Sequence, residues 1–343
     1  MSIRWSALCA PSAGVRLLLA AAISCAGCAS TTSVALDPSG SSLTVQHPAL
    51  YPETIEYDRT RDAFVVGSFR EGAIYAVDRQ GNAQNIVNDA RLCSVLGIAI
   101  DASRNRLWAV NSDFASSLKP SAAGAKQLAA VGVYDLKHGN ALEYVDLAQL
   151  APGPHLLNGI ALDASGNAYV TDSFSPNIYK VDAQGRASLF LSDPRFVGEG
   201  INLNGLVVHP DGYLLVIKKS DGTLFKVPLD KPAALVQVKL DAPIIGGDGV
   251  LLASDRNLVI IANQVPGTAS NAAFALTTQD GWNSAKLQAK AALGDVYPTT
   301  AVLRDRSLFV IHSKLNELIQ AAPEHKAELK EQALIREIGR VEP

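Results

Sequence analysis

Side chains with oxygen donors open four similar motifs at widely separated places in the chain. Each motif starts with one polar residue and continues into an apolar run, and the opening residues are Glu53, Asn158, Asn204 and Asp248. Two carboxylates and two amide carbonyls around one axis suit a hard divalent cation of the calcium or magnesium type, completed by water, whereas zinc and copper prefer His and Cys. The motifs predict a metal site, provided that the fold brings these residues together.

An internal repeat predicts secondary-structure elements that would bring these four residues together. Six units with a similar start follow one another at intervals of about 50 residues, and their opening residues are Glu53, Leu96, Asn158, Asn204, Asp248 and Thr299. Most units continue with a polar turn and further apolar runs, as in residues 163–171. Four antiparallel strands per unit predict an all-β fold, a six-bladed β-propeller of four-stranded antiparallel blades over residues 50–341. The innermost strands of such a fold line a central channel, with the opening residues at its mouth.

Three segments fall outside the repeat. Residues 113–130 are predicted to form an insertion in the second blade that overhangs one face of the disc. Residues 323–332 begin with Pro and are rich in helix-favouring residues, which predicts a short surface helix. Residues 333–338 fit either a helix or the last outer strand, and we favour the strand. Whether a strand at 42–45 closes the ring in the sixth blade stays open.

The composition indicates a globular chain that lacks the basic segments of a nucleic-acid-binding protein. Of the 343 residues, 48% are hydrophobic and 18% are charged, which is far too apolar for a disordered protein. The 30 Lys and Arg residues face 33 Asp and Glu residues, and no basic run occurs. Nucleic acid is therefore not an expected partner.

The N-terminal segment has the features of an export signal. Arg4 and Arg16 are the only charges before Cys28, and the apolar stretch at 17–26 is too short to span a membrane. Residues 24–30 resemble the bacterial lipobox, which predicts a signal peptide at 1–28 and lipidation of Cys28. Cys25 stands where a Leu-like residue is usual, so simple cleavage nearby, or none, stays open. We expect a tether at 29–49, a membrane anchor, and a periplasmic or outer-membrane location.

The order of the opening residues resembles the gluconolactonase and senescence-marker-protein family of calcium-dependent six-bladed propellers. Paraoxonase and strictosidine synthase are more distant relatives. In that family a Glu of the first blade, Asn residues of two middle blades and an Asp of the following blade hold a divalent metal. These map onto Glu53, Asn158, Asn204 and Asp248.

The resemblance implies a metal-dependent hydrolase that opens a lactone or related ester. The cation would polarise the carbonyl of a small-molecule substrate, and Asp248 would act as the catalytic general base. This chain departs from the family in having Thr54 after Glu53, where Gly is usual, and in lacking an obvious Arg near Asn158. The substrate is therefore not defined.

The same residues have plainer interpretations. Asn-Gly is a strong hairpin-turn signal, so Asn158 and Asn204 could make turns. The alternative function is a non-catalytic exported propeller that binds a sugar, peptide or protein partner, with a structural metal or none.

For four other polar residues, the sequence gives only weak indications of a role. His155, close to Asn158, is a candidate substrate-binding residue, although a lone His is more often a surface or loop residue. Asp172 is predicted to cap a turn. The pair Lys218 and Lys219 is predicted to be a solvated strand end.

Overall fold

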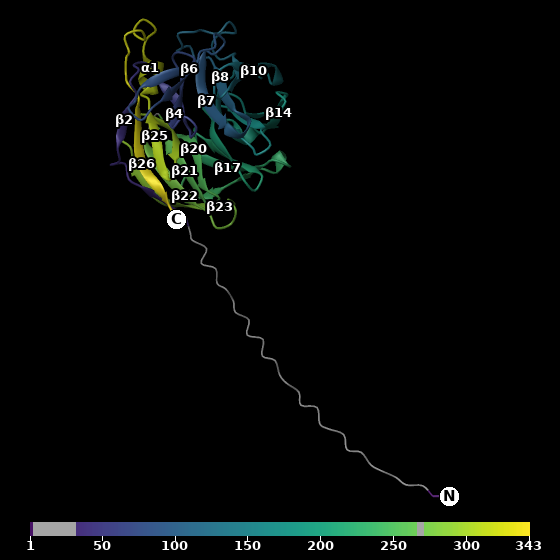
Figure 1. Cartoon of the computed structure of the whole chain (residues 1–343). Helices are drawn as coiled ribbons and strands as arrows, with labels where there is room; N and C mark the ends of the chain where they lie inside the picture. Colours follow the sequence, from purple (N-terminus) through teal and green to yellow (C-terminus); the bar gives the residue numbers. More distant parts are fainter. Residues whose placement is uncertain (3–31, 266–270) are drawn as a thin grey trace. The chain divides into compact units, whose positions relative to one another are not determined.

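Consecutive hairpins build each sheet of the structure. The computed structural model describes residues 1–2, 32–265 and 271–343; the predicted signal peptide and Cys28 lie outside these residues, apart from Met1 and Ser2. Six sheets surround a common centre, which confirms the predicted six-bladed β-propeller (Figure 1). No helix among the described residues is long and apolar enough to cross a membrane.

The first three blades are four-stranded and antiparallel, and the strands run outward from the channel. Blade 1 contains β3 (Pro52–Asp58), β4 (Ala63–Ser68), β5 (Ala73–Val77) and β6 (Ala83–Val87). Blade 2 contains β7 (Ser94–Asp101), β8 (Arg106–Ser112), β9 (Ala129–Asp135) and β10 (Ala141–Asp146). Blade 3 contains β11 (Leu157–Leu162), β12 (Ala168–Asp172), β13 (Asn177–Val181) and β14 (Ala187–Ser192). The predicted insertion lies between β8 and β9.

Blades 4 and 5 share a small irregularity at the rim. Blade 4 contains β15 (Leu203–His209), β16 (Tyr213–Lys218), β17 (Thr223–Pro228) and the short β18 (Val236–Gln237). Blade 5 contains β20 (Gly247–Ser254), β21 (Asn257–Ala262), β22 (Ala272–Thr277) and β23 (Ser284–Ala292). A fifth strand, β19 (Lys239–Leu240), pairs in parallel with β23, so this blade departs from the purely antiparallel prediction. Four 3₁₀ turns occur at Ala102–Arg104, Ala148–Leu150, Pro194–Phe196 and Pro232–Ala234.

The sixth blade joins the two ends of the described chain. It contains β24 (Pro298–Arg304), β25 (Ser307–His312) and β26 (Leu334–Glu342), followed by β1 (Ser33–Leu36), with β2 (Ser42–Thr44) also on β26. N-terminal strands therefore close the ring, which the sequence left open. The tether prediction is wrong for residues 33–36 and 42–44, because their backbone groups pair with β26. The strand favoured for 333–338 is confirmed.

The predicted helix at 323–332 is wrong. Residues 323–328 form successive turns, and the α-helix of this segment is α1 (Leu315–Gln320). Leu315 and Leu318 of α1 are buried, whereas most of residues 323–332 are exposed. A short helix gains its stability from packing an apolar face more than from propensity, so the segment with buried leucines is the helical one.

Apolar clusters fill the spaces between neighbouring blades. Strand β4, with all six residues buried, packs on both sides: Val66 belongs to the cluster shared with blade 6, and Val65 to the cluster shared with blade 2. The free cysteine Cys93 is buried as well. Packing on both faces of every blade fixes the innermost strands around the channel.

Candidate active site at the channel mouth

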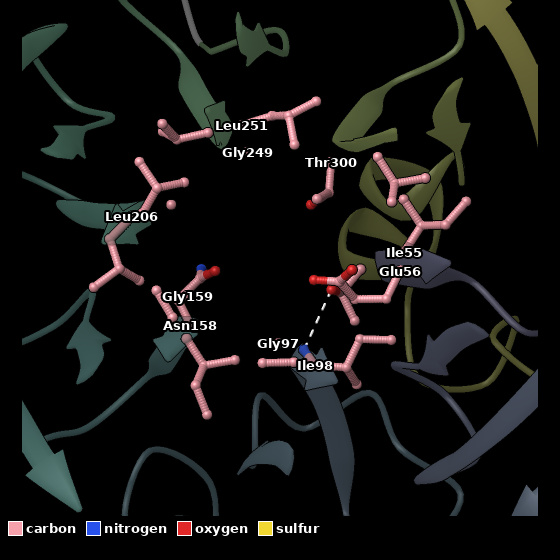
Figure 2. Close-up of a pocket in the computed structure, with 18 of the residues that line it drawn as sticks. Ile55, Glu56, Gly97, Ile98, Asn158, Gly159, Leu206, Gly249, Leu251 and Thr300 are labelled. Carbon is pink, nitrogen blue, oxygen red and sulfur yellow. Dashed lines mark hydrogen bonds between the residues drawn. The ribbon is translucent and has the colours of Figure 1, made fainter. Parts of the chain in front are cut away.

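Each innermost strand carries a β-bulge at its opening residue. The register of all six inner hairpins shifts at this point. A bulge re-aims side chains, and it occurs often beside functional sites. The six residues within the bulges are all buried: Glu53, Leu96, Asn158, Asn204, Asp248 and Thr299. In the view along the channel, the Asn158 amide points toward the open centre (Figure 2).

The glycines after the opening residues allow the inner strands to approach closely. A Cβ at Gly159 would lie 2.6 Å from the Asn204 carbonyl oxygen, and a Cβ at Gly205 would lie 2.3 Å from the Asp248 carbonyl oxygen. Asn158 and Asn204 lie inside strands β11 and β15, so the interpretation as hairpin turns is wrong. The Asn-Gly pairs are channel-lining features.

One small cavity, here called the mouth cavity, is lined by all four predicted ligand residues. Its volume is about 40 Å³. Apolar side chains from the insertion, from α1 and from loops at the same end of the channel complete its wall; they include Phe69, Phe114, Leu156, Ile201, Leu315 and Ile319. The remaining polar side chains in the wall are Lys219 and Tyr297. The fold thus brings the predicted residues together and adds a lysine.

Lys219 is buried within this cluster. Its Nζ lies 2.6 Å from Asp248 Oδ2 and donates to Asn263 Oδ1, and the ammonium lies 5.9 Å from the centre of the Tyr297 ring. Only 4% of the residue is exposed. Lys218 is buried as well, with Nζ 2.7 Å from the Val197 carbonyl oxygen. The prediction of a solvated strand end is therefore wrong for both lysines.

Lys219 occupies a position that recurs in every blade, although the residue type at this position differs between blades. It is the first residue after the second strand of its blade, β16. The equivalent residues of the other blades are also buried: Phe69, Asp113, Ser173, Asn263 and Ser313. This position follows the strand that pairs with each opening residue, so the six residues form a second ring beside the first.

The charges of the cluster depend on one another. Burial, together with the neighbouring Asp248 carboxylate, raises the pKa of Glu53 well above its usual range. Burial alone would lower the pKa of Lys219, but Asp248 outweighs this effect and the pKa of Lys219 is raised. The arrangement is a carboxyl group with a raised pKa beside a Lys–Asp ion pair.

The residues present do not fit a bound divalent metal in this arrangement. Lys219 and Asn263 both donate to Asp248 Oδ2, and Asp248 Oδ1 receives no N–H or hydroxyl group from the described residues. The ammonium lies against the carboxylate that a cation would use, and a dication beside it would be repelled. Across the described part of the chain, no group of three or more His, Cys, Asp or Glu side chains could hold a metal.

His155 and Asp172 form a separate structural pair. His155 Nδ1 lies 2.7 Å from Asp172 Oδ2, and Asp172 Oδ1 accepts from the backbone N–H groups of Leu156 and Phe174. The hydrogen bond to Asp172, opposed by burial, raises the pKa of His155. The capping role predicted for Asp172 agrees with these bonds. His155 lines a surface pocket with Ala151 and Gly153 and not the mouth cavity.

Two larger spaces adjoin the mouth cavity. On one side a cleft of about 1000 Å³, here called the side cleft, shares five wall residues with it: Phe114, Ile201, Lys219, Tyr297 and Ile319. On the other side, the channel itself encloses about 330 Å³, mostly between apolar residues, and Glu56 projects into it (Figure 2). A ligand in the side cleft would contact Lys219 directly.

Comparisons with known proteins identify the fold and go no further. No protein-family profile and no curated protein matches the sequence. The Malassezia sympodialis allergen Mala s 1 is 19% identical, with a TM-score of 0.69 over 89% of this chain and 96% of the allergen. A calcium-binding regucalcin from Agrobacterium tumefaciens is 15% identical, with a TM-score of 0.61 over 89% and 97%. A Xanthomonas campestris gluconolactonase is 13% identical, with a TM-score of 0.60 over 89% and 91%.

These neighbours confirm the predicted resemblance in its architecture. They include a gluconolactonase and a regucalcin, and all of them share the propeller fold with this chain. Identities this low carry the fold and not the activity, because one fold hosts many functions. The chain is a six-bladed β-propeller with a buried polar cluster at one end of its channel.

Proposed function

We propose that this protein is a hydrolase of lactones or related esters of small molecules, with the mouth cavity as its active site. The observation that supports this most is the convergence of two carboxyl groups, Asp248 and Glu53, beside the Lys219 ammonium in a buried cavity, where the pKa of Glu53 is raised well above its usual range. Paired carboxyl groups with different protonation states serve as base and acid. The gluconolactonase among the structural neighbours is consistent with this proposal.

The chain's own residues suffice for the proposed reaction. Asp248 accepts a proton from water while the water oxygen bonds to the ester carbonyl carbon. The Lys219 ammonium and the amide N–H groups of Asn158 and Asn204 stabilise the oxyanion. The ring C–O bond then breaks and Glu53 gives its proton to the leaving alkoxide. Asp248 then passes the proton that it took from water to Glu53 in the same cavity, which restores both groups.

The mouth cavity is small and partly walled by apolar side chains, which limits how a substrate could reach Asp248. A cavity of about 40 Å³ holds roughly one water molecule, so the substrate body would occupy the side cleft. Phe114 and Ile319 lie in the walls of both spaces and would have to move for the carbonyl group to reach Asp248. This apolar cover is what favours the second candidate function, a non-catalytic propeller that binds a sugar, peptide or protein partner.

A lactone panel with matched variants tests the proposal. The wild-type protein is expected to hydrolyse at least one lactone, and Asp248→Asn is expected to lower kcat by about 10²-fold or more because it removes the base. Asp211→Asn, an exposed carboxylate in the hairpin of blade 4, serves as the control and should keep full activity. Absence of turnover on the whole panel, or full activity of Asp248→Asn, would favour the binding propeller.

The location of the protein is part of the proposal. The sequence features of residues 1–28 support export and lipidation at Cys28, which would attach the protein to a bacterial membrane outside the cytoplasm. Membrane fractionation combined with labelling by a fatty-acid analogue tests this point, and an unlabelled protein in the soluble fraction would contradict it.

A further inference from the structure

The cluster at the channel mouth already contains a cation that belongs to the chain. We propose that the Lys219 ammonium, paired with Asp248 at the channel mouth, takes the place of a divalent metal, so that the native protein is metal-free and removal of this ammonium creates a divalent-cation site. The inference concerns the residues of the proposed active site but does not depend on turnover, because its readout is bound metal.

The contacts of Lys219 support this assignment. Its Nζ lies 2.6 Å from Asp248 Oδ2 and also donates to Asn263 Oδ1, and both partners come from blade 5. Lys219 comes from blade 4, so the ammonium bridges two blades at the ring of opening residues. A divalent ion at Asp248 would need to displace a buried ammonium from both oxygen atoms.

The oxygen donors around the ammonium suit a metal once the ammonium is removed. Glu53 and Asp248 supply carboxylates, and three amide side chains supply further carbonyl oxygens: Asn158, Asn204 and Asn263. Neither Asn158 nor Asn204 makes a side-chain hydrogen bond to another described residue, so both are available as donors. Such an all-oxygen set is what Ca²⁺ prefers. Without Lys219, no side-chain cation would pair with the buried Asp248 beside Glu53.

Four proteins separate the alternatives: wild type, Lys219→Ala, Lys219→Gln and the control Lys218→Ala. Lys218, the last residue of β16, is a buried lysine that donates to the Val197 and Arg195 carbonyl oxygens, away from the cluster. Each protein would be incubated with Ca²⁺, freed of excess ion, and analysed for metal content and for thermal unfolding with Ca²⁺ or a chelator. Lys219→Gln provides a variant of similar size in case Lys219→Ala does not fold.

The expected result is no bound metal in the wild type and in Lys218→Ala, with no change of Tm on adding Ca²⁺. The Lys219 variants are expected to bind one Ca²⁺ per chain and to show a higher Tm with Ca²⁺ than with the chelator. Adding Asp248→Asn to Lys219→Ala should abolish this gain. Stoichiometric metal in the wild type, or no metal in any folded Lys219 variant, overturns the inference.

The outcomes distinguish this inference from the proposed function. A metal-free wild type that hydrolyses lactones in the presence of chelator supports both. A metal-free wild type without turnover contradicts the hydrolase alone. A wild type that holds Ca²⁺ and loses turnover with the chelator contradicts the Lys219 assignment alone, and it supports the metal-dependent reaction that the family resemblance implies.

Discussion

Glu56 is a carboxyl group in an otherwise largely apolar stretch of the channel. Its side chain projects between the innermost strands (Figure 2). Ile98, Leu162 and Val208 contribute to the channel wall. Burial raises the pKa of Glu56 to about 7. Because the folded state binds this proton more tightly than the unfolded chain does, the group lowers the free energy of unfolding as pH rises from the unfolded pKa to the folded pKa.

Glu56→Gln is therefore expected to remove part of the pH dependence of stability. The variant should match the wild type at about pH 4 and be more stable at about pH 8, because only the wild type must ionise a half-buried carboxyl group there. Urea unfolding of both proteins at several pH values measures the difference. Parallel stability curves for the two proteins over this range would show that channel water solvates the carboxylate fully.

Lys219 marks the limit of prediction at the residue scale. Glu53, Asn158, Asn204 and Asp248 could be chosen from sequence because each opens a repeat unit, and the repeat fixes where a unit begins. Lys219 directly follows the end of β16, next to another lysine, and such lysine pairs at strand ends are usually solvated. Its burial depends on Asp248 and Asn263 of the next blade, and this pairing between blades has no local signal in the sequence.

At the scale of elements, the inner strands depend on glycine for their mutual approach. Gly205 lies where a Cβ would be 2.3 Å from the Asp248 carbonyl oxygen and 2.8 Å from the Val250 nitrogen. Both neighbours are backbone atoms of β20, so no side-chain rotation relieves the overlap. The bulged start of β15 would have to move away from blade 5.

Gly205→Ala is expected to destabilise the protein by about 3 kcal/mol, at the upper end of the cost of overpacking. The control is Gly212→Ala in the hairpin of blade 4, where a Cβ would meet nothing within 4 Å but φ is +84°. This turn substitution should cost about 1 kcal/mol, from backbone strain alone. Denaturant unfolding compares the two, and an equal or smaller loss for Gly205→Ala would contradict the close-packing argument.

The hairpins could be predicted from sequence, while the pieces between them could not. Turns such as residues 163–167 combine Asp, Gly and Asn with flanking apolar runs, and the structure has a hairpin there, between β11 and β12. Residues 323–332 have helix propensity but no apolar face to bury, whereas Leu315 and Leu318 give α1 its packing. Strands β1 and β2 lie in a Ser- and Thr-rich segment, and their partner β26 is at the other end of the chain.

At the scale of the whole molecule, ring closure depends on the segment before the first blade. Val34 of β1 is buried in the cluster that blades 5 and 6 share, and Val45, directly after β2, is buried in the cluster that blades 6 and 1 share. Removal of β1 and β2 would expose these apolar surfaces and leave β26 as an unpaired edge. The domain therefore begins at β1 and not at residue 50.

Two truncated proteins test this boundary. A chain that starts at Thr32 is expected to fold and remain monodisperse. A chain that starts at Leu50 is expected to lose several kcal/mol of stability, roughly the cost of exposing two or more core side chains, and to aggregate. Thermal unfolding and size-exclusion chromatography measure both effects. Equal Tm values for the two proteins would show that the remaining three strands of blade 6 suffice.

The pairing of Ser33 with Glu342 also determines when the protein can finish folding. A growing polypeptide makes blades 1 to 5 in order, but until β26 emerges the nascent arc has two open ends and an incomplete channel. Contacts between the beginning and the end of a chain are slow to form because the intervening loop is long. If the protein is exported as proposed, this delay keeps the polypeptide incompletely folded, and therefore competent for translocation, until its last residues have crossed the membrane.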